Sequence, residues 1–246
     1  MRNVTRAFAR HYAEQLNKAP ELDSVEMLFV MPPATLIRDM AEVSSRPEFL
    51  IGAQNFCPAS EGEFTGELSL AHLKEAGAGI VLAGHAERRL LFHETNEIVG
   101  IKVKKALSEK LYAVFCIGDL KRDQSDDALK AFLLEQVSAA LNSLDVSEVQ
   151  RLIIAYEPVW AIGQNALDAA SPERVGRSVN AIRSCVDARF PGAAVPILYG
   201  GSVNKENCED LMGYAGVNGL FVGRSATDPE VFLAIVRKAL SKAAPA

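Results

Sequence analysis

The amino-acid sequence predicts an α/β fold in which parallel strands alternate with helices. Seven short runs are apolar at nearly every position, which is typical of strands buried on both faces within a parallel sheet. Longer segments with helical spacing of apolar residues lie between these runs, and this alternation indicates repeated βα units. No linker rich in Pro, Gly or Ser divides the 246 residues, so we expect a single domain over residues 1–246.

The order of the elements predicts a barrel that lacks one strand. The predicted strands are 27–31, 49–53, 79–83, 112–117, 152–157, 196–200 and 219–222, and the helical segments include 96–110, 126–143, 172–189 and 204–213. The chain opens with a helix, since Val4, Phe8, Tyr12 and Leu16 recur at helical spacing. A closed (β/α)₈ barrel needs eight strands, so we expect such a barrel with its first strand absent at the N-terminus.

Charge and cysteine content restrict the partners and the compartment. The net charge of −5 argues against nucleic acid or an anionic membrane held by bulk charge. No apolar run approaches the roughly 18 residues of a membrane span, and the N-terminus lacks the apolar centre of a secretory signal. The four cysteines have neither zinc-ligand nor redox spacing, and the four histidines form no metal cluster. We therefore expect a cytoplasmic protein without a metal or an organic cofactor.

Two strand ends carry residues suited to acid–base chemistry, because barrels of parallel strands place function at the C-terminal ends of their strands. His85 follows one strand and enters a helical segment, whose N-terminal dipole disfavours an imidazolium and leaves a neutral hydrogen-bond donor. Glu157 ends an apolar strand, where a carboxylate is costly unless it is paired or functional. A structural histidine and an arginine-paired glutamate remain the alternative interpretations.

Two glycine turns follow the last two predicted strands, at 200–202 and 223–224. Glycines let backbone N–H groups approach an oxyanion closely, and barrels commonly bind phosphate after these two strands. Simple tight turns are the alternative. The segment after Glu157 contains Trp160 and Gly163, which suit a hinge and a lid, although an ordinary βα loop explains them equally well.

Taken together, the strand ends resemble the triosephosphate isomerase family, from about residue 4 to residue 240. The matching segments are AQN at 53–55, FTGE at 64–67, GHAERR at 84–89, FCIGD at 115–119, AYEPVWAIG at 155–163, YGGSVN at 199–204 and GLFVG at 219–223. Their joint occurrence in this order is far more specific than any single motif. The resemblance implies a TIM barrel.

The resemblance also implies roles for individual residues. Glu157 is similar to the base that moves a proton between the two carbons beside the carbonyl, and His85 to the neutral group that polarises the oxygens. The phosphate grip corresponds to Gly163, Ser202, Gly223 and the backbone of Arg224, and supporting residues are Asn55, Glu87, Arg88 and Cys116. From its own sequence context, Cys116 is interpreted as a small packing residue. Residues 55–67 resemble a loop that inserts into a second subunit, with Thr65 reaching the partner's site, so we expect a homodimer.

The sequence departs from the family pattern in three places. The family's first strand ends in Asn-x-Lys, and this sequence has no counterpart, so we expect the natural chain to begin one strand earlier and the 246 residues alone to be insoluble or nearly inactive. Arg224 stands where most members have a second glycine, and the segment 163–168 differs from the common lid. The last two features resemble a branch that acts on four-carbon ketose phosphates such as erythrulose phosphate.

Three functions follow as hypotheses. The first is triose-phosphate isomerase, which converts dihydroxyacetone phosphate to glyceraldehyde 3-phosphate through an enediolate in glycolysis and gluconeogenesis. The second is a tetrulose phosphate isomerase with the same mechanism. The third belongs to another class, a catalytically impaired barrel that only binds a phosphate ligand. The retained His85 and Glu157 favour an enzyme, since a binder gains nothing from a base directed at carbon.

Overall fold

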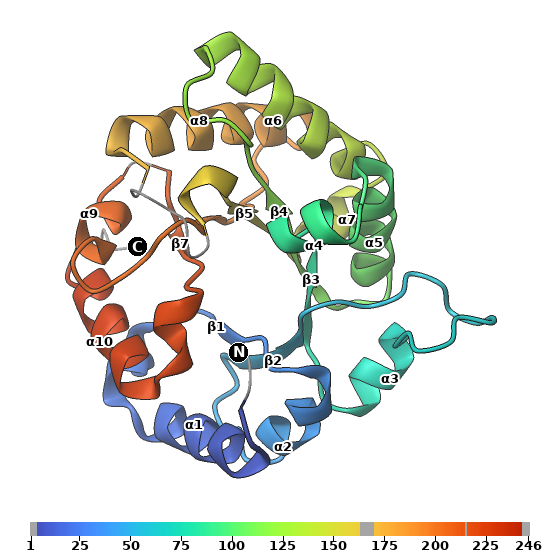
Figure 1. The fold of residues 1–246 in the computed structure, drawn as a ribbon, viewed down its shortest axis with the longest axis vertical. Helices are drawn as coiled ribbons and strands as arrows, with labels where there is room; N and C mark the ends of the chain where they lie inside the picture. Colours follow the sequence, from blue (N-terminus) through green and yellow to red (C-terminus); the bar gives the residue numbers. More distant parts are fainter. Residues whose placement is uncertain (1–3, 163–169, 215, 243–246) are drawn as a thin grey trace.

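The computed structural model describes residues 4–162, 170–214 and 216–242, and its centre is a curled parallel sheet. Seven strands pair in chain order, β1-β2-β3-β4-β5-β6-β7, and helices surround them (Figure 1). The strands are β1 Leu28–Val30, β2 Phe49–Ala53, β3 Ile80–Ala83, β4 Tyr112–Ile117, β5 Leu152–Tyr156, β6 Ile197–Tyr199 and β7 Gly219–Leu220. The predicted α/β barrel class is confirmed, and each predicted strand run contains an observed strand.

Ten α-helices are found in the described part of the chain. They are α1 Arg6–Lys18, α2 Ile37–Ala41, α3 Leu70–Glu75, α4 Ala86–Leu91, α5 Asn96–Ser108, α6 Asp126–Leu141, α7 Val146–Val149, α8 Pro172–Arg189, α9 Cys208–Met212 and α10 Pro229–Leu240. Four 3₁₀ helices join them, namely η1 Pro20–Ser24, η2 Ala34–Leu36, η3 Val159–Ala161 and η4 Arg224–Thr227. The helix predicted over 204–213 is wrong at its start, because the Asn204 side chain accepts the N–H groups of Glu206 and Asn207 and forms a turn there.

Helix α1 forms as its sequence predicts. Thr5 is the N-cap, and its hydroxyl accepts the N–H of Phe8. Tyr12 and Leu16 lie on the buried face of this helix, while Arg10 on its outer side reaches Glu42 just after α2. An amphipathic helix of this kind gains most of its stability by burying one face against the body of the protein.

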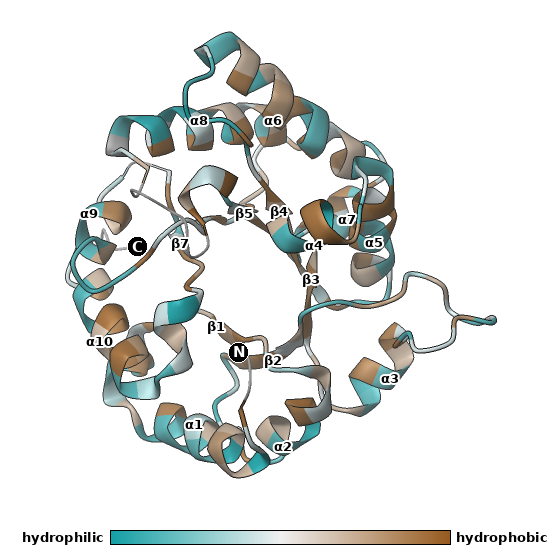
Figure 2. Cartoon of the chain, viewed as in Figure 1, coloured by the Kyte–Doolittle hydropathy of each residue, from teal (hydrophilic) through white to brown (hydrophobic). Residues whose placement is uncertain are grey.

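The strands bury both of their faces, which explains their unbroken apolar sequences. Successive side chains point alternately into the barrel and toward the helices, so Val114 and Cys116 join the interior cluster while Ala113 and Phe115 join the outer one. The strands in Figure 2 are accordingly hydrophobic, and the hydrophilic colours gather on the surrounding helices.

The sheet of the described residues has two open edges, at β1 and at β7, which do not pair with each other. The rings of Phe29 on β1 and Phe221 just after β7 approach to 5.9 Å between centroids. A side-chain contact therefore joins the two ends of the sheet where no backbone ladder does. The prediction of seven strands rather than eight is confirmed for the described chain.

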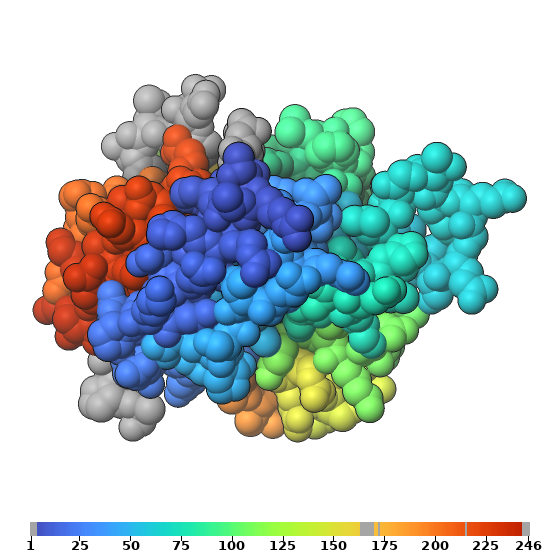
Figure 3. Space-filling model, turned by 90° about the horizontal axis from the view of Figure 1, so that it is seen from below, coloured from blue at the N-terminus to red at the C-terminus, as the bar shows by residue number. Residues whose placement is uncertain are grey.

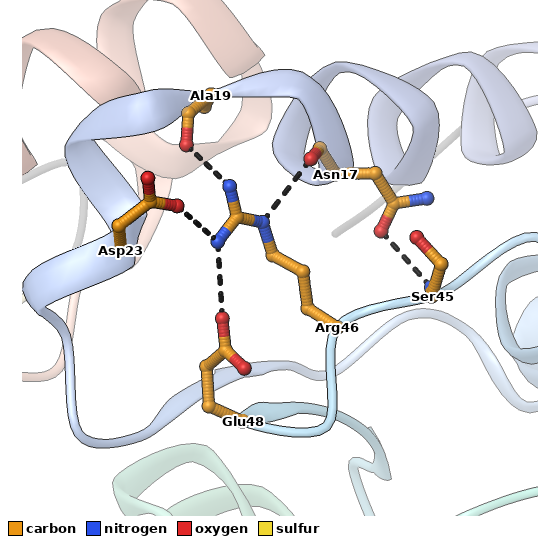
Figure 4. Close-up of polar contacts among 6 residues, drawn as sticks. All are labelled: Asn17, Ala19, Asp23, Ser45, Arg46 and Glu48. Carbon is orange, nitrogen blue, oxygen red and sulfur yellow. Dashed lines mark hydrogen bonds and ion pairs between the residues drawn. The ribbon is translucent and has the colours of Figure 1, made fainter.

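Arg46 fastens the end of α1 to the start of β2 (Figure 4). Its guanidinium donates to the backbone carbonyls of Asn17 and Ala19 at 3.2 and 2.7 Å. It also pairs with Asp23 at 2.8 Å and Glu48 at 3.1 Å. A cation at a helix C-terminus satisfies carbonyls that have no partner within the helix. This one side chain thus ties α1, η1 and β2 together.

The described residues include neither a membrane-spanning helix nor a metal cluster. No described helix combines the length and apolar character needed to cross a bilayer. No group of three His, Cys, Asp or Glu side chains in the described chain is arranged to hold a metal ion. The four cysteines are free thiols.

Candidate active site

Two predicted site residues meet above the C-terminal ends of the strands. Glu157 directly follows β5, and His85 follows β3 after a single glycine. The Nε2 atom of His85 lies 3.3 Å from Oε1 of Glu157. Residues 72 positions apart in sequence therefore come into contact, as expected from two strands whose ends share one rim of the barrel.

The surroundings of His85 determine which ring nitrogen carries the proton. His85 is the N-cap of α4, and its Nδ1 accepts the backbone N–H of Glu87 at 3.3 Å. An imidazole nitrogen that accepts a hydrogen bond has no proton, so the hydrogen of the neutral ring is on Nε2, directed at Glu157. Gly84, with φ of +75°, permits the sharp turn from β3 into this cap.

Glu157 is a buried carboxylate with only 2% of its surface exposed. Burial raises the pKa of this carboxyl above its ordinary value, because the charged form loses its hydration. The nearby His85, the Ala86 N–H that donates to Oε2 at 3.1 Å, the Cys116 thiol and the charge of Arg89 oppose that rise. A carboxylate with a raised pKa and a partner at hydrogen-bond distance is suited to take and return a proton.

Two glycines allow the backbone to close around Glu157. An added Cβ at Gly118 would lie 1.7 Å from the carbonyl oxygen of Glu157, so no larger residue fits there without moving Glu157. An added Cβ at Gly200 would lie 3.0 Å from Cγ of Glu157. The first glycine turn therefore begins directly beside the carboxylate.

Arg89 is a functional neighbour that the sequence reasoning missed. Its guanidinium donates to the carbonyls of Gly84 at 2.8 Å and Cys116 at 3.2 Å, and to the side chain of Asn96 at 2.7 Å. It thus joins β3 to β4 immediately below Glu157 and contributes a positive charge there. A cavity of about 190 Å³ lined by Arg89 and Glu157 lies beside this link. Arg89 is the second arginine of the GHAERR segment, and this was the sequence feature that could have indicated it.

Cys116 lies on β4 and is fully buried next to Glu157. Burial and the adjacent negative charge raise the pKa of its thiol, which disfavours a nucleophilic thiolate. The residue therefore packs against the carboxylate and can donate to it.

The two glycine turns form one connected unit. Ser202 and Gly223 follow β6 and β7, and the hydroxyl of Ser225 donates to the carbonyl of Val203 at 2.9 Å, which joins the turns. Among the described residues, the N–H groups of Gly201, Ser202 and Gly223 have no protein acceptor. Such neighbouring amides make a site for an oxyanion. Arg224 is exposed at the start of η4, and Gly163 with the predicted lid at 163–168 lies outside the described residues.

Two of the other predicted supporting residues, Arg88 and Asn55, belong to one network. Arg88 donates to Glu94 at 2.6 Å, and Lys102 pairs with the same carboxylate while also donating to Asn55 at 2.7 Å. Pairing with the two cations lowers the pKa of Glu94 in spite of its burial. Glu87 is exposed, and its backbone N–H, rather than its carboxylate, contacts the His85 ring.

A second buried network holds the segment that follows Glu157. The carboxylate of Asp119 is fully buried and accepts from the Tyr156 hydroxyl at 2.6 Å and the Trp160 indole at 2.9 Å. Arg174 on α8 pairs with it at 2.8 Å. Asp119 therefore links the end of β5, η3 and the first turn of α8.

The predicted dimer loop forms an arm that projects from the body, as Figures 1 and 3 show for the segment between β2 and α3. Thr65 is exposed on this arm, and the neighbouring Phe64 is 51% exposed. Leu91 and Phe92, at the end of α4, are 69% and 62% exposed. Exposed large apolar side chains of this kind mark surfaces that contact other molecules.

Comparison with known proteins agrees with this architecture. The sequence model of the family described as triosephosphate isomerase matches residues 2–239. A protein of Rhizobium rhizogenes named L-erythrulose-1-phosphate isomerase is 40% identical over 98% of this chain and 92% of its own length. One of the same name from Brucella abortus is 41% identical over 98% of this chain and 94% of its own. A triosephosphate isomerase of Idiomarina loihiensis is 34% identical over 97% and 93%.

Fold, site and relatives together define an isomerase of a small phosphorylated sugar. The chain belongs to the triosephosphate isomerase family, as the motifs at its strand ends predict.

Proposed function

We propose that this protein interconverts two ketose isomers of a four-carbon sugar phosphate, with L-erythrulose 1-phosphate as one of the pair. The contact between Glu157 and His85 beside two glycine turns carries the isomerase part of the proposal. The four-carbon substrate is supported by the names of relatives 40% and 41% identical to this chain. Arg224 stands in the second glycine turn, where most family members have glycine. This replacement resembles the same branch and also supports the four-carbon substrate.

The proposed reaction moves a proton between neighbouring carbons. In L-erythrulose 1-phosphate the carbonyl is at C2, and C3 carries a hydroxyl and a hydrogen. Glu157 takes the C3 hydrogen as a proton, and the electron pair that it leaves forms an enediolate over C2 and C3. The hydroxyl hydrogen passes from O3 to O2, Glu157 returns its proton to C2, and the carbonyl is then at C3. The balance needs no external oxidant or base.

His85 and the glycine turns have separate tasks in this proposal. The Nε2–H of His85 donates to the substrate oxygens on which negative charge develops, and a neutral donor does so without protonating them fully. The amides of Ser202, Gly223 and Arg224 bind the phosphate, with Gly163 as a further contact outside the described residues. Cys116 and Arg89 hold the carboxylate of Glu157 from below.

The three-carbon reaction, from dihydroxyacetone phosphate to glyceraldehyde 3-phosphate, is the second candidate. It uses the same residues, and the family name together with the 34% identical relative from Idiomarina loihiensis favours it. The deciding measurement is kcat/KM for both substrates on one preparation. A preference of about tenfold or more for the four-carbon compound, roughly 1.4 kcal/mol in transition-state binding, supports our proposal, and the opposite preference overturns it.

Glu157→Asp separates an enzyme from a mere binder. The shorter carboxylate withdraws the base from carbon, so turnover should fall by about 10²-fold or more while affinity for inorganic phosphate stays the same. Glu173→Asp, at an exposed position on α8, is the matched control and should change neither quantity. A chain that binds phosphate but converts neither sugar, before and after the substitution, would belong to the impaired class.

We also propose that the protein is a homodimer joined through the arm. The exposed Phe64 beside Thr65 and the exposed Leu91 and Phe92 support this interface. Light scattering should give twice the chain mass for the unchanged protein, and Phe64→Asp should shift the mass toward that of one chain. Val146→Asp replaces another exposed apolar residue, on α7, and should leave the mass unchanged. A monomer in all three samples would contradict the proposal.

A further inference from the structure

A buried tyrosine on α1 contacts the segment that carries the second glycine turn. The hydroxyl of Tyr12 donates to the backbone carbonyl of Ala226 in η4 at 2.8 Å, across 214 positions of sequence. Tyr12 is fully buried, and its ring packs against Phe8. The hydrogen bond therefore anchors η4 to α1.

The segment that Tyr12 holds is short. η4 is a single turn of 3₁₀ helix, closed by the Ala226 N–H donating to the carbonyl of Gly223 at 3.0 Å and by the Thr227 hydroxyl donating to the carbonyl of Arg224 at 2.8 Å. Short 3₁₀ turns have poor hydrogen-bond geometry, so contacts with the rest of the protein must fix their position. Two side-chain hydroxyls supply such contacts, from Tyr12 to Ala226 and from Ser225 to Val203.

We propose that Tyr12 is a positioning residue for phosphate binding, which acts through Ala226 and does not touch the ligand. By holding this carbonyl it fixes the peptide planes of η4, and with them the amide groups of Gly223 and Arg224. The inference rests on the proposed function, because the proposed function assigns the binding of a sugar phosphate to the glycine turns.

The Tyr12 hydroxyl can donate its hydrogen bond at every pH at which an enzyme works. Burial, with a smaller contribution from the charge of Asp228, raises the pKa of Tyr12 far above neutrality. The hydroxyl therefore stays protonated over the whole working range of an enzyme. Its loss should weaken phosphate binding equally at every pH, whereas loss of an ionising group would change the shape of the pH profile.

The test removes one oxygen and measures affinity for inorganic phosphate by calorimetry. Tyr12→Phe keeps the ring and should weaken phosphate binding by about threefold to tenfold, the effect of one neutral hydrogen bond. KM for the sugar phosphate should rise by the same factor with kcat unchanged, because phosphate contacts are made equally in ground and transition states. Ser225→Ala, which removes the second hydroxyl contact, should act in the same direction.

Tyr112→Phe is the matched control, because Tyr112 begins β4 at the opposite end of the strands. The Tyr112→Phe variant should bind phosphate with the same affinity as the unchanged chain. If Tyr12→Phe lowers the temperature of unfolding but leaves the phosphate affinity unchanged, Tyr12 only packs α1 and our inference is wrong, while the proposed isomerase stands. If the unchanged chain binds no phosphate, the assignment of the glycine turns fails and the inference fails with it.

Discussion

Replacing Arg174 by methionine tests the buried network around Asp119. Methionine fills a similar volume but leaves the Asp119 carboxylate, which is fully buried, without its only charged partner among the described residues. Two neutral donors remain, the hydroxyl of Tyr156 and the indole of Trp160. The variant thus removes a counter-charge while the carboxylate keeps part of its hydrogen bonding.

The expected loss of stability is large for a single side chain. Removing one partner of a buried ion pair costs about 3–5 kcal/mol, because the other charge stays desolvated. The two remaining donors place Arg174→Met at the lower end, about 3 kcal/mol. For a domain of about 250 residues, each kcal/mol shifts the midpoint of thermal unfolding by about 2–4 °C, so we expect a decrease of about 6–12 °C.

Calorimetry or circular dichroism against temperature measures this shift, and α8 offers a matched control. Arg177 pairs with Asp126 at 3.1 Å, but both side chains are more than half exposed. Arg177→Met should therefore change stability by less than about 1 kcal/mol. The double variant Asp119→Asn with Arg174→Met should recover part of the loss, since no charge is then left buried. Equal effects of the two arginine substitutions would refute the reasoning.

Three further predictions concern Glu157 and its surroundings. The kcat/KM should rise with pH through the pKa of Glu157, which burial places above 4.5, because only the ionised carboxylate accepts a proton. That raised pKa means that the folded chain binds more protons than the unfolded chain between pH 4.5 and the folded value, so stability falls as pH rises through this window. Glu157→Gln should therefore unfold at a higher temperature than the unchanged chain at pH 7, and this advantage should disappear below pH 4.5; an advantage that persists there would contradict the prediction. Gly118→Ala should lower kcat/KM by about 10²-fold, because the new methyl displaces the Glu157 carbonyl, whereas Gly176→Ala, with open space around it, should retain full activity.

The barrel could be predicted because its strands are buried on both faces. Runs such as 112–117 and 152–157 have no polar face to confuse with a helix, so their apolar character marks them with little ambiguity. The helix at 172–189 begins and ends where predicted, since Ser171 caps it and Pro172 occupies its first position. The short strand β7 is harder to delimit, because only its first two predicted residues pair with β6.

Only the site residues that directly follow a strand could be predicted from the sequence. Position along a strand places His85 and Glu157 on one rim, but it does not say which neighbouring side chain turns toward them. Consecutive residues of a helix point about 100° apart, so Arg88 and Arg89 face different networks although they are adjacent. The partners of Asp119 lie 37, 41 and 55 positions further along the chain, and no local pattern indicates this network.

The backbone ladders of the sheet differ in length: the long ones lie on either side of β4, and a short one holds β7. β4 pairs with β3 over four residues and with β5 over five, whereas β6 and β7 share only two pairs, as do β2 and β3, and both residues of β7 are half-buried. Amide hydrogen exchange should therefore be slowest in β4 and β5 and fastest near Leu220. Glu157 follows the strongly paired strand β5, whereas the second glycine turn follows β7. If that turn binds phosphate as we propose, local opening near β7 would release the phosphate while Glu157 keeps its place.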